Sequence, residues 1–477
     1  MGNDEFWSID SKKKVSIQHL KLVQYIGQLG FANLDMGIGN LVLAKIQNNI
    51  VKETSTSEIS KVILNKLQEG SHEEVMEAFT RGISGYIAPK KLELLPSIKP
   101  LKSADTAKVS WLYFKNCAVK ITESNIKMVK YKNLPHKIWD KCVTPQNFME
   151  LSDVQSQFET FCFNISGKDS TRHEALMTQI GYLLSTYNDP GNPKAIIMID
   201  QEMSEYGEAN GGTGKSLLAK AVGILRNVVT IDGKHYNPTN PFGNQNIEYS
   251  TDILCFDDMG KNFNFETIFS MITSGITVNK KFKQAYYIDA KDAPKILINS
   301  NYIVRGPGGN ADKRRRCEFE IAPHYDKINT PKTEFGNVFF EGWDPDEYNR
   351  FFSYMLKCAQ SYLKKGLIIS KPINLLKNRL VRLTSNEFVE FLDKNLKVDV
   401  KIDKRQFITD FHQEYPNSKE TSSHAFTKML KIYAEENGLK YDDQSSGGNY
   451  YFFMEDNNLD KEIGPDENEC NNLQSPK

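Results

Sequence analysis

Residues 207–225 read G-E-A-N-G-G-T-G-K-S-L-L-A-K-A-V-G-I-L, a glycine-rich stretch that leads into a helical pattern. They follow the apolar run K-A-I-I-M-I-D of residues 194–200, which is typical of a buried strand. A strand, a glycine-rich turn and a helix start together present backbone N–H groups to phosphate. The phosphate-loop pattern is G-x-x-x-x-G-K-[ST], and Ala209 stands where its first glycine would be. The stretch is therefore either a nucleotide site with one altered position or a glycine-rich turn before a helix.

If the stretch is a nucleotide site, the loop residues surround the phosphates, because glycine allows positive φ angles and close backbone approach. Lys215 would place its charge on the β- and γ-phosphates, and the Ser216 hydroxyl would bind Mg²⁺. Ala can follow many turn geometries, so Ala209 is a tolerable change. The residues expected to hold the nucleotide are Asn210, Gly211, Gly212, Thr213, Gly214, Lys215 and Ser216.

Two adjacent acids end the next apolar run, I-L-C-F-D-D, at Asp257 and Asp258. Neighbouring carboxylates at a strand end are costly unless they serve a cation or a proton. We expect Asp257 to hold Mg²⁺ together with Ser216, and Asp258 to orient or deprotonate the attacking water. The alternative is a pair of residues that cap the start of a helix.

A third apolar run, K-I-L-I-N-S-N, ends at Asn301, whose amide could position the same water. The alternative is a turn residue after a strand.

Three arginines then precede a fourth apolar run. Arg314 or Arg315 is the expected arginine finger, which would reach the γ-phosphate of a neighbouring subunit and stabilise transition-state charge. The arginines could instead form a solvated basic edge.

Residues 280–284 read K-K-F-K-Q, with two tyrosines shortly after them. Basic residues interleaved with aromatic ones suit single-stranded nucleic acid, since the charges follow phosphates and a ring can stack on a base. The residues expected to contact DNA are Lys280, Lys281, Phe282 and Lys283. An exposed basic hairpin without a ligand would have the same composition.

The bulk composition excludes some classes of protein. The 477 residues carry no net charge, so a basic surface for nucleic acid must be local. The seven cysteines form no C-x-x-C pair, which argues against a zinc knuckle and favours a reducing compartment. No run approaches membrane-span length and no signal peptide is recognisable, so we expect no membrane partner and a cytoplasmic protein.

In this order, the motifs A-N-G-G-T-G-K-S, I-L-C-F-D-D and K-I-L-I-N-S-N resemble those of superfamily 3 helicases, over residues 194–322. These are ring-forming AAA+ ATPases of viruses, phages and plasmids. The resemblance implies a P-loop core that uses ATP and Mg²⁺, and a ring, expected to be a hexamer, that hydrolyses ATP between subunits. It also implies a DNA-contacting hairpin, in which Lys281 matches a lysine of papillomavirus-type helicases and Phe282 replaces a histidine.

Flanking stretches, such as F-K-N-C-A-V-K-I-T from residue 114 and I-G-Y-L-L-S-T-Y from residue 180, look like poxvirus-type primase-helicases of phages and mobile elements. The resemblance implies replication in a bacterial host cytoplasm, with a separate primase or polymerase as a candidate partner. Residues 1–105 show no paired-acid catalytic strand, which argues against primase activity. Two other functions stay open: an ATP-switched DNA-binding initiator or regulator, and a P-loop phosphotransferase.

Short apolar runs that alternate with helical patterns predict an α/β multidomain protein with a parallel sheet. Three helical stretches followed by two strand-like runs around a Gly-Gly turn predict a winged helix near the end of the sequence. The expected domains are an N-terminal α+β region of unknown role (1–105), a β-meander with a helical collar (106–190), an AAA+ ATPase domain (191–335), a helical linker (336–380), a winged-helix domain (381–455) and an acidic disordered tail (456–477).

Overall fold

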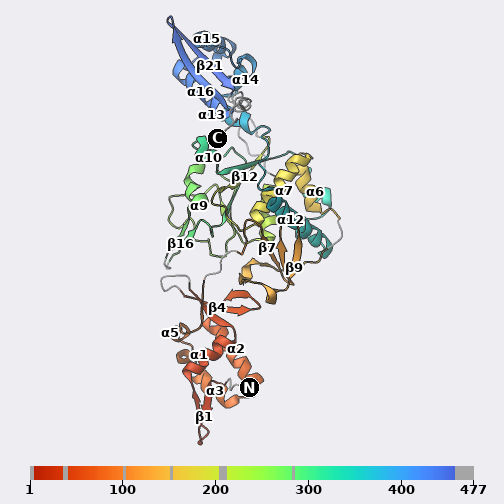
Figure 1. The fold of residues 1–477 in the computed structure, drawn as a ribbon, viewed down its shortest axis with the longest axis vertical. Coiled ribbons are helices and arrows are strands. Elements are labelled where there is room, and N and C mark those ends of the chain that lie inside the picture. The colour runs from red at the N-terminus through yellow and green to blue at the C-terminus, as the bar shows by residue number, and fades with distance from the viewer. Residues whose placement is uncertain are drawn as a thin grey trace, which may run out of the picture. The chain divides into compact units, whose positions relative to one another are not determined.

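The computed structural model describes residues 5–35, 41–99, 104–150, 154–202, 212–281 and 285–456 (Figure 1). The chain divides into two compact units, one of residues 1–200 with 209–370, the other of residues 201–208 with 371–477. Both units mix helices and strands, and the first contains a parallel sheet. The fold is therefore α/β and multidomain, as the sequence predicts. The predicted acidic tail lies almost wholly outside the described residues.

The first unit is built around a five-stranded sheet in which all neighbouring strands run parallel. The strand order is β13-β14-β17-β12-β18. The strands are β12 (Ala195–Asp200), β13 (Val228–Asp232), β14 (Ile253–Asp257), β17 (Lys295–Ser300) and β18 (Arg316–Ile321). Parallel sheets are covered on both faces, which explains why β12, β14, β17 and β18 read as apolar runs.

Strand β13 is the one that the sequence pattern does not predict. The helical spacing after the loop continues through residue 229, yet helix α8 (Lys215–Leu225) ends before Arg226, whose backbone is extended. Val228 and Val229 then pair with β14. Both residues are β-branched, which suits a sheet, and pairing with the neighbouring strand outweighs their local helical spacing.

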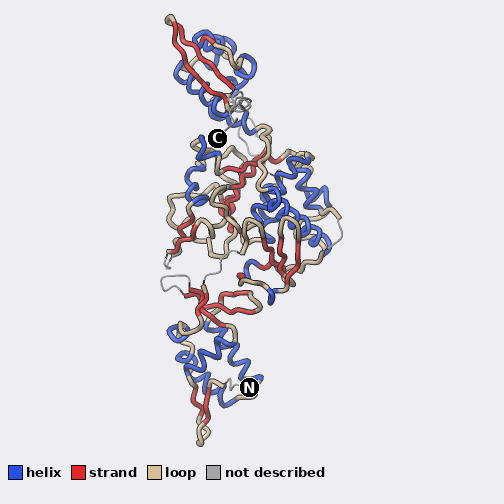
Figure 2. The backbone as a smooth tube through the Cα atoms, viewed as in Figure 1, coloured by secondary structure: helices blue, strands red, loops and turns tan. Residues whose placement is uncertain are grey.

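Helices α6 (Gln157–Ile165), α7 (Ser170–Leu184) and α12 (Pro345–Lys365) pack against one another, and Figure 2 shows them gathered on one side of the central strands. Helix α12 falls in the stretch predicted to be a linker. The structure differs from that expectation, because Phe351, Phe352 and Met355 of α12 are fully buried in the main core. The boundary between the units instead follows Ser370.

The predicted β-meander forms a four-stranded sheet of order β11-β7-β8-β9 in the same unit. Its strands are β7 (Ser110–Phe114), β8 (Ala118–Ile121), β9 (Ile126–Val129) and β11 (Val143–Thr144). Leu112, Phe114 and Val119 belong to the core shared with α7 and α12. Meander, helices and parallel sheet are therefore one packed body, although they were expected as two domains divided near residue 190.

The N-terminal region has a core of its own and a mixed sheet of order β10-β5-β4-β3-β6. The strands are β3 (Phe31–Asp35), β4 (Leu41–Gln47), β5 (Ile50–Glu53), β6 (Ser97–Ile98) and β10 (Ile138–Trp139). The helices are α1 (His19–Gln28), α2 (Thr56–Glu69), α3 (Glu73–Arg81), α4 (Ile83–Tyr86) and α5 (Pro89–Leu92). A short hairpin, β1 (Trp7–Ile9) with β2 (Val15–Ile17), precedes them.

The second unit contains the three helices that the sequence predicts, now α14, α15 and α16, the predicted hairpin of β20 and β21, and one further helix, α13. The helices are α13 (Leu375–Leu383), α14 (Asn386–Asn395), α15 (Lys404–Glu414) and α16 (Ser423–Glu436). The strands are β19 (Ile402–Asp403), β20 (Leu439–Ser446) and β21 (Asn449–Asp456), in the order β19-β21-β20. Phe388, Phe407, Phe411, Phe426 and Phe452 fill its core.

Short elements connect the larger ones in the first unit: α9 (Phe269–Thr273), β15 (Gly275–Val278), β16 (Tyr286–Asp289), α10 (Gly309–Lys313) and α11 (Pro331–Phe335). Across the described residues, every helix is too short or too polar to cross a membrane.

The contact between α7 and α12 depends on Gly181. A Cβ atom there would collide with the carbonyl oxygen of Cys358 and lie 2.7 Å from the Cβ of Tyr362. We therefore predict that Gly181→Ala lowers the free energy of unfolding by about 1–3 kcal/mol, measured by urea denaturation. Gly223→Ala is the matched control in α8, where the new Cβ would make ordinary contacts. Equal stability of the two variants would contradict this packing.

Candidate active site

The carboxyl ends of β12, β17 and β14 lie side by side at one edge of the parallel sheet. A cavity of about 490 Å³ opens there. Its lining residues are Gly212, Thr213, Gly214, Lys215, Ser216, Leu217, Asp257, Asp258, Asn299, Asn301, Thr330, Pro331, Lys332, Asn337, Val338 and Phe339. The structure thus brings together the described loop residues, Asp257, Asp258 and Asn301. Of the other predicted loop residues, Asn210 and Gly211 lie outside the described residues.

The glycines of the loop are required by its conformation. Gly212 and Gly214 have φ angles of 103° and 108°, in a region that side chains disfavour. A Cβ atom at Gly214 would also lie 2.6 Å from the Phe161 ring. Gly214 directly precedes α8, so the start of this helix lies at the loop, as anion binding by backbone N–H groups requires.

Lys215 is buried and lies at the centre of a small polar cluster. Its Nζ donates to the Asp200 carboxylate at 2.6 Å and lies 3.2 Å from Thr213 Oγ1, which donates to the same carboxylate oxygen at 2.6 Å. Burial lowers the pKa of Lys215, and the Asp200 charge opposes that shift. Sequence reasoning missed Asp200, although an acid at the end of an apolar strand was a signal for it.

Ser216 and Asp257 meet across the cavity. The Ser216 hydroxyl lies 3.1 and 3.2 Å from the two carboxylate oxygens of Asp257. Asn299, which sequence reasoning missed, donates its side-chain N–H to Asp257 at 2.8 Å and so orients the carboxylate. Asn299 and Asn301 are two residues apart at the end of β17, the spacing at which side chains share a face.

Hydroxyl and carboxylate oxygens are the ligands that Mg²⁺ prefers. Ser216 and Asp257 are therefore chemically suited to hold the ion. Within the described ranges, no group of three or more His, Cys, Asp or Glu side chains could hold a metal without help. A magnesium ion here would depend on these two residues, water and phosphate oxygens, which is how Mg²⁺ is commonly bound beside nucleotides.

Asp258 has a strained backbone, with φ at 55°. Its carboxylate accepts a hydrogen bond from the Asn301 amide at 3.1 Å and pairs with the Lys234 ammonium. The two residues expected to act on the attacking water are therefore in direct contact. Lys234 follows β13, the strand that the sequence pattern did not predict, and for that reason the residue was missed.

The arginines before β18 do not line the cavity. Arg316 is buried and pairs with Asp312 and Glu318. Arg315 is also buried, donates to the carbonyl oxygen of Ala311 at 2.6 Å, and stacks 4.6 Å from the Phe269 ring centre. Arg314 is exposed. Of the two candidate fingers, only Arg314 is therefore placed to reach a neighbouring molecule without rearrangement.

The predicted basic hairpin is formed by β15 and β16, which pair antiparallel. Lys280 and Lys281 lie in its turn, while Phe282 and Lys283 are outside the described residues. Lys281 is exposed, and the Lys280 ammonium lies 5.8 Å from the ring centre of Tyr286. The turn thus presents positive charge beside an aromatic ring, the combination that single-stranded nucleic acid favours.

The second unit carries further basic and aromatic side chains on its surface. His424, Lys428 and Lys431 on α16 are exposed. Arg405 of α15 and Tyr450 of β21 form a pair that sequence reasoning missed: the Arg405 guanidinium lies 4.8 Å from the Tyr450 ring centre. Exposed Tyr450 and Arg405 could contact a nucleic acid backbone and base.

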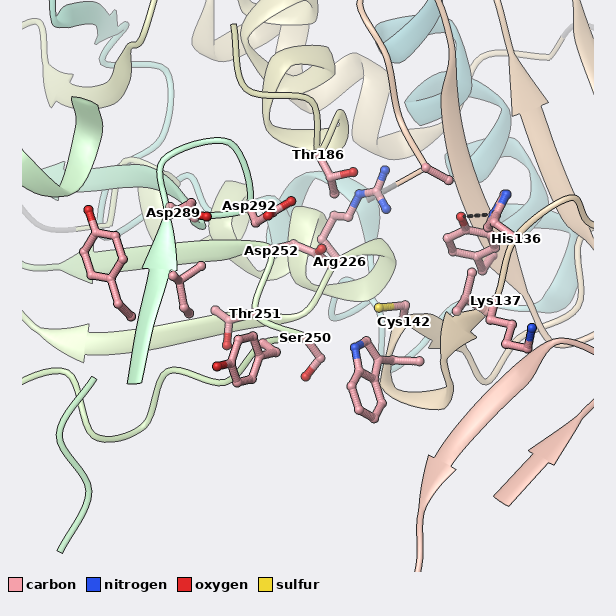
Figure 3. Close-up of a pocket in the computed structure, with 18 residues that line it drawn as sticks. His136, Lys137, Cys142, Thr186, Arg226, Ser250, Thr251, Asp252, Asp289 and Asp292 are labelled. Carbon is pink, nitrogen blue, oxygen red and sulfur yellow. Dashed lines mark hydrogen bonds between the residues drawn. The ribbon is translucent and has the colours of Figure 1, made fainter. Parts of the chain in front are cut away.

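A second cavity, of about 280 Å³, lies where β13, β14 and β17 begin (Figure 3). Asp252, Asp289 and Asp292 lie on one side of it, and His136 and Lys137 on the other. Burial raises the pKa of the Asp252 carboxyl, which accepts the Asn227 backbone N–H at 2.9 Å.

Arg226, a buried residue that lines this second cavity, forms its contacts with other groups of the protein. It pairs with Asp105 at 3.3 Å and donates to the carbonyl oxygens of Leu184 and Trp111. The cavity is separated from the loop by the length of a strand, roughly 16 Å for five residues. It is therefore too distant to present a ligand to Lys215 in the first cavity.

A family model described as a family of unknown function (DUF5906) matches residues 207–316. Among solved structures, the apo structure of the NrS-1 C-terminal region (305–718) is similar at 14% identity and a TM-score of 0.44, covering 91% of this chain and 99% of that one. The A form apo structure of the NrS-1 C-terminal region gives 12% identity and a TM-score of 0.43, covering 91% and 98%. No curated protein matches the sequence significantly.

The geometry around Gly214 leads to a prediction for the loop. Gly214→Ala introduces both the disfavoured φ angle and a collision with Phe161, whereas Gly212→Ala introduces the φ angle alone. We expect Gly214→Ala to weaken nucleotide affinity about tenfold more than Gly212→Ala, since overpacking costs about 1–3 kcal/mol. Calorimetric dissociation constants provide the comparison. Partial recovery in Gly214→Ala with Phe161→Leu would support the collision, and equal affinities of the two single variants would refute it.

Proposed function

We propose that this protein is an ATP-dependent DNA helicase that acts in replication of a phage, plasmid or integrated mobile element. The observation that carries the proposal is the single cavity at the sheet edge. It gathers Lys215, the Ser216 hydroxyl, the carboxylates of Asp257 and Asp258 and the amides of Asn299 and Asn301 from three separate segments of the chain. ATP hydrolysis needs groups for the phosphates, for Mg²⁺ and for the attacking water, and these side chains match that set.

In the proposed reaction, Lys215 and the N–H groups of the first turn of α8 bind the phosphates. Ser216 and Asp257 would hold Mg²⁺, which would supply positive charge to the phosphates. Asp258 accepts a proton from the attacking water or orients it, and Asn301 fixes the Asp258 carboxylate through the hydrogen bond between them. The exposed Arg314 completes the site of a neighbouring copy, in a ring that the family resemblance implies is a hexamer.

The proposed track for DNA is the turn between β15 and β16. Lys280 and Lys281 would follow phosphates, and hydrolysis at the sheet edge would move the turn relative to its neighbours in the ring. The exposed side chains of α16 and Tyr450 with Arg405 offer a second contact to DNA. A separate primase or polymerase would then work on the separated strands.

The exposed basic residues of the second unit also favour a second candidate, an ATP-switched DNA-binding initiator or regulator. That protein would use the same nucleotide site but would not separate strands. A phosphotransferase is less well supported, because the second cavity opens at the opposite edge of the sheet from the phosphate loop.

The test is strand separation on forked DNA with ATP and Mg²⁺, together with the mass of the assembly by mass photometry. Wild-type protein should form a ring and separate the strands. Lys215→Ala should lose hydrolysis by on the order of a hundredfold or more, because the charge on the phosphates is removed. A monomer without unwinding would rule out the helicase, and normal hydrolysis by Lys215→Ala would rule out the site.

The hairpin turn gives a separate prediction. Lys281→Ala removes an exposed charge at the turn, so DNA stimulation of ATP hydrolysis should fall several-fold while hydrolysis without DNA stays within twofold. Lys291→Ala is the matched control, since it removes an equally exposed lysine after β16, away from the turn. The readout is the phosphate release rate with and without single-stranded DNA. If DNA stimulates ATP hydrolysis equally in wild type and in Lys281→Ala, the turn does not contact DNA as proposed.

A further inference from the structure

The cavity at the sheet edge has two chemically different ends. One is charged and holds Lys215, Asp257 and Asp258. The other is formed by Leu217 at the start of α8 and by the segment of residues 330–339. The apolar side chains at this second end are Leu217, Pro331, Val338 and Phe339, and the same segment also contributes the exposed Lys332.

At the apolar end, the side chain of Val338 is not fully covered by other parts of the protein. It is 41% exposed, although it borders a cavity, whereas the adjacent Phe339 is 3% exposed and belongs to the main core. A flat apolar ligand would cover Val338 and gain the free energy of that burial. Polar ligands such as free phosphate or pyrophosphate would leave this end uncovered.

Asn337 supplies a polar group at the same end. Its side-chain N–H donates to the Phe335 carbonyl oxygen at 3.2 Å, which fixes the orientation of the amide, since a flipped amide would set two oxygens against each other. Its Oδ1 is buried and, among the described residues, accepts no hydrogen bond. A buried acceptor without a donor is unfavourable, so this atom is suited to a ligand that brings an N–H group.

The two ends are held at a fixed spacing by Phe161. Its ring lies under Gly214 of the phosphate loop, and its ring centre lies 5.8 Å from that of Phe339. The segment before Asn337 is also fixed locally. Thr330 caps α11 with a reciprocal pair of hydrogen bonds to Thr333, and Gly336 ends α11 with φ at 71°.

We propose that the end of the cavity formed by Leu217, Pro331, Asn337 and Val338 binds the base of the nucleotide, and that Asn337 Oδ1 selects adenine through its exocyclic amino group. The inference rests on the proposed function, since it assigns the base of the nucleotide whose phosphates lie beside Lys215. Guanine carries an oxygen acceptor in place of the amino group, so it would face Asn337 Oδ1 with a repulsive contact.

The test compares ATP with purine riboside triphosphate, which differs from ATP only in lacking the exocyclic amino group. Dissociation constants are measured by calorimetry at fixed Mg²⁺ with the full chain. Wild-type protein should bind ATP about tenfold more tightly than the analogue, and GTP more weakly than ATP. Asn337→Ala should bring the affinities for ATP and the analogue within about twofold, while the analogue binds as it does to wild type.

Asn329→Ala is the matched control, because Asn329 is an exposed asparagine whose amide donates to the His324 carbonyl oxygen, and it does not line the cavity. It should keep the wild-type preference. Equal wild-type affinity for ATP and the analogue would overturn the base assignment while leaving the proposed nucleotide site intact. Absence of binding by any of the three nucleotides would overturn the proposed function, and this inference with it.

Discussion

The position of β17 between β12 and β14 is the constraint on which the candidate site depends. Strands β12 and β14 come before β17 in the sequence, yet β17 lies between them in the sheet, so the ends of three strands share one edge. Loop residues after β12, Asp257 after β14 and the amides of β17 therefore converge, although about a hundred residues separate Asp200 from Asn301. With β17 on an outer edge, its amides could not reach the two acids.

Two lysines at this edge of the sheet already pair with carboxylates in the protein without a ligand. Lys215 pairs with Asp200, and Lys234 pairs with Asp258. Removing the buried Lys215 charge from water is costly, and Asp200 compensates part of that cost. A triphosphate would offer Lys215 a second anionic partner, so binding exchanges one ion pair for another. Lys234 thus contacts a residue with a strained backbone, Asp258, whose carboxylate is expected to act on the attacking water.

The strand ends and the loop were predictable because their signals are local: apolar runs, glycines and terminal acids. Asp200 and Asn299 are also polar residues at the ends of apolar runs. They were not predicted as site residues, because the glycine-rich loop and Asn301 had already been assigned to the ends of the same two strands. Strand β13, Lys234 and the core position of α12 depend on pairing and packing between distant segments, which local spacing does not encode. The burial of Arg315 and Arg316 depends likewise on Phe269 and Phe265, which no pattern near the arginines reveals.

We propose that one cavity holds both the phosphates and the base of ATP. The most direct measurement is an experimental structure of the full chain with Mg²⁺ and a non-hydrolysable ATP analogue. In that structure we expect the triphosphate beside Lys215, the metal at Ser216 and Asp257, and the base against Val338 and Asn337. A triphosphate bound elsewhere on the chain, or an empty cavity at saturating analogue, would contradict it.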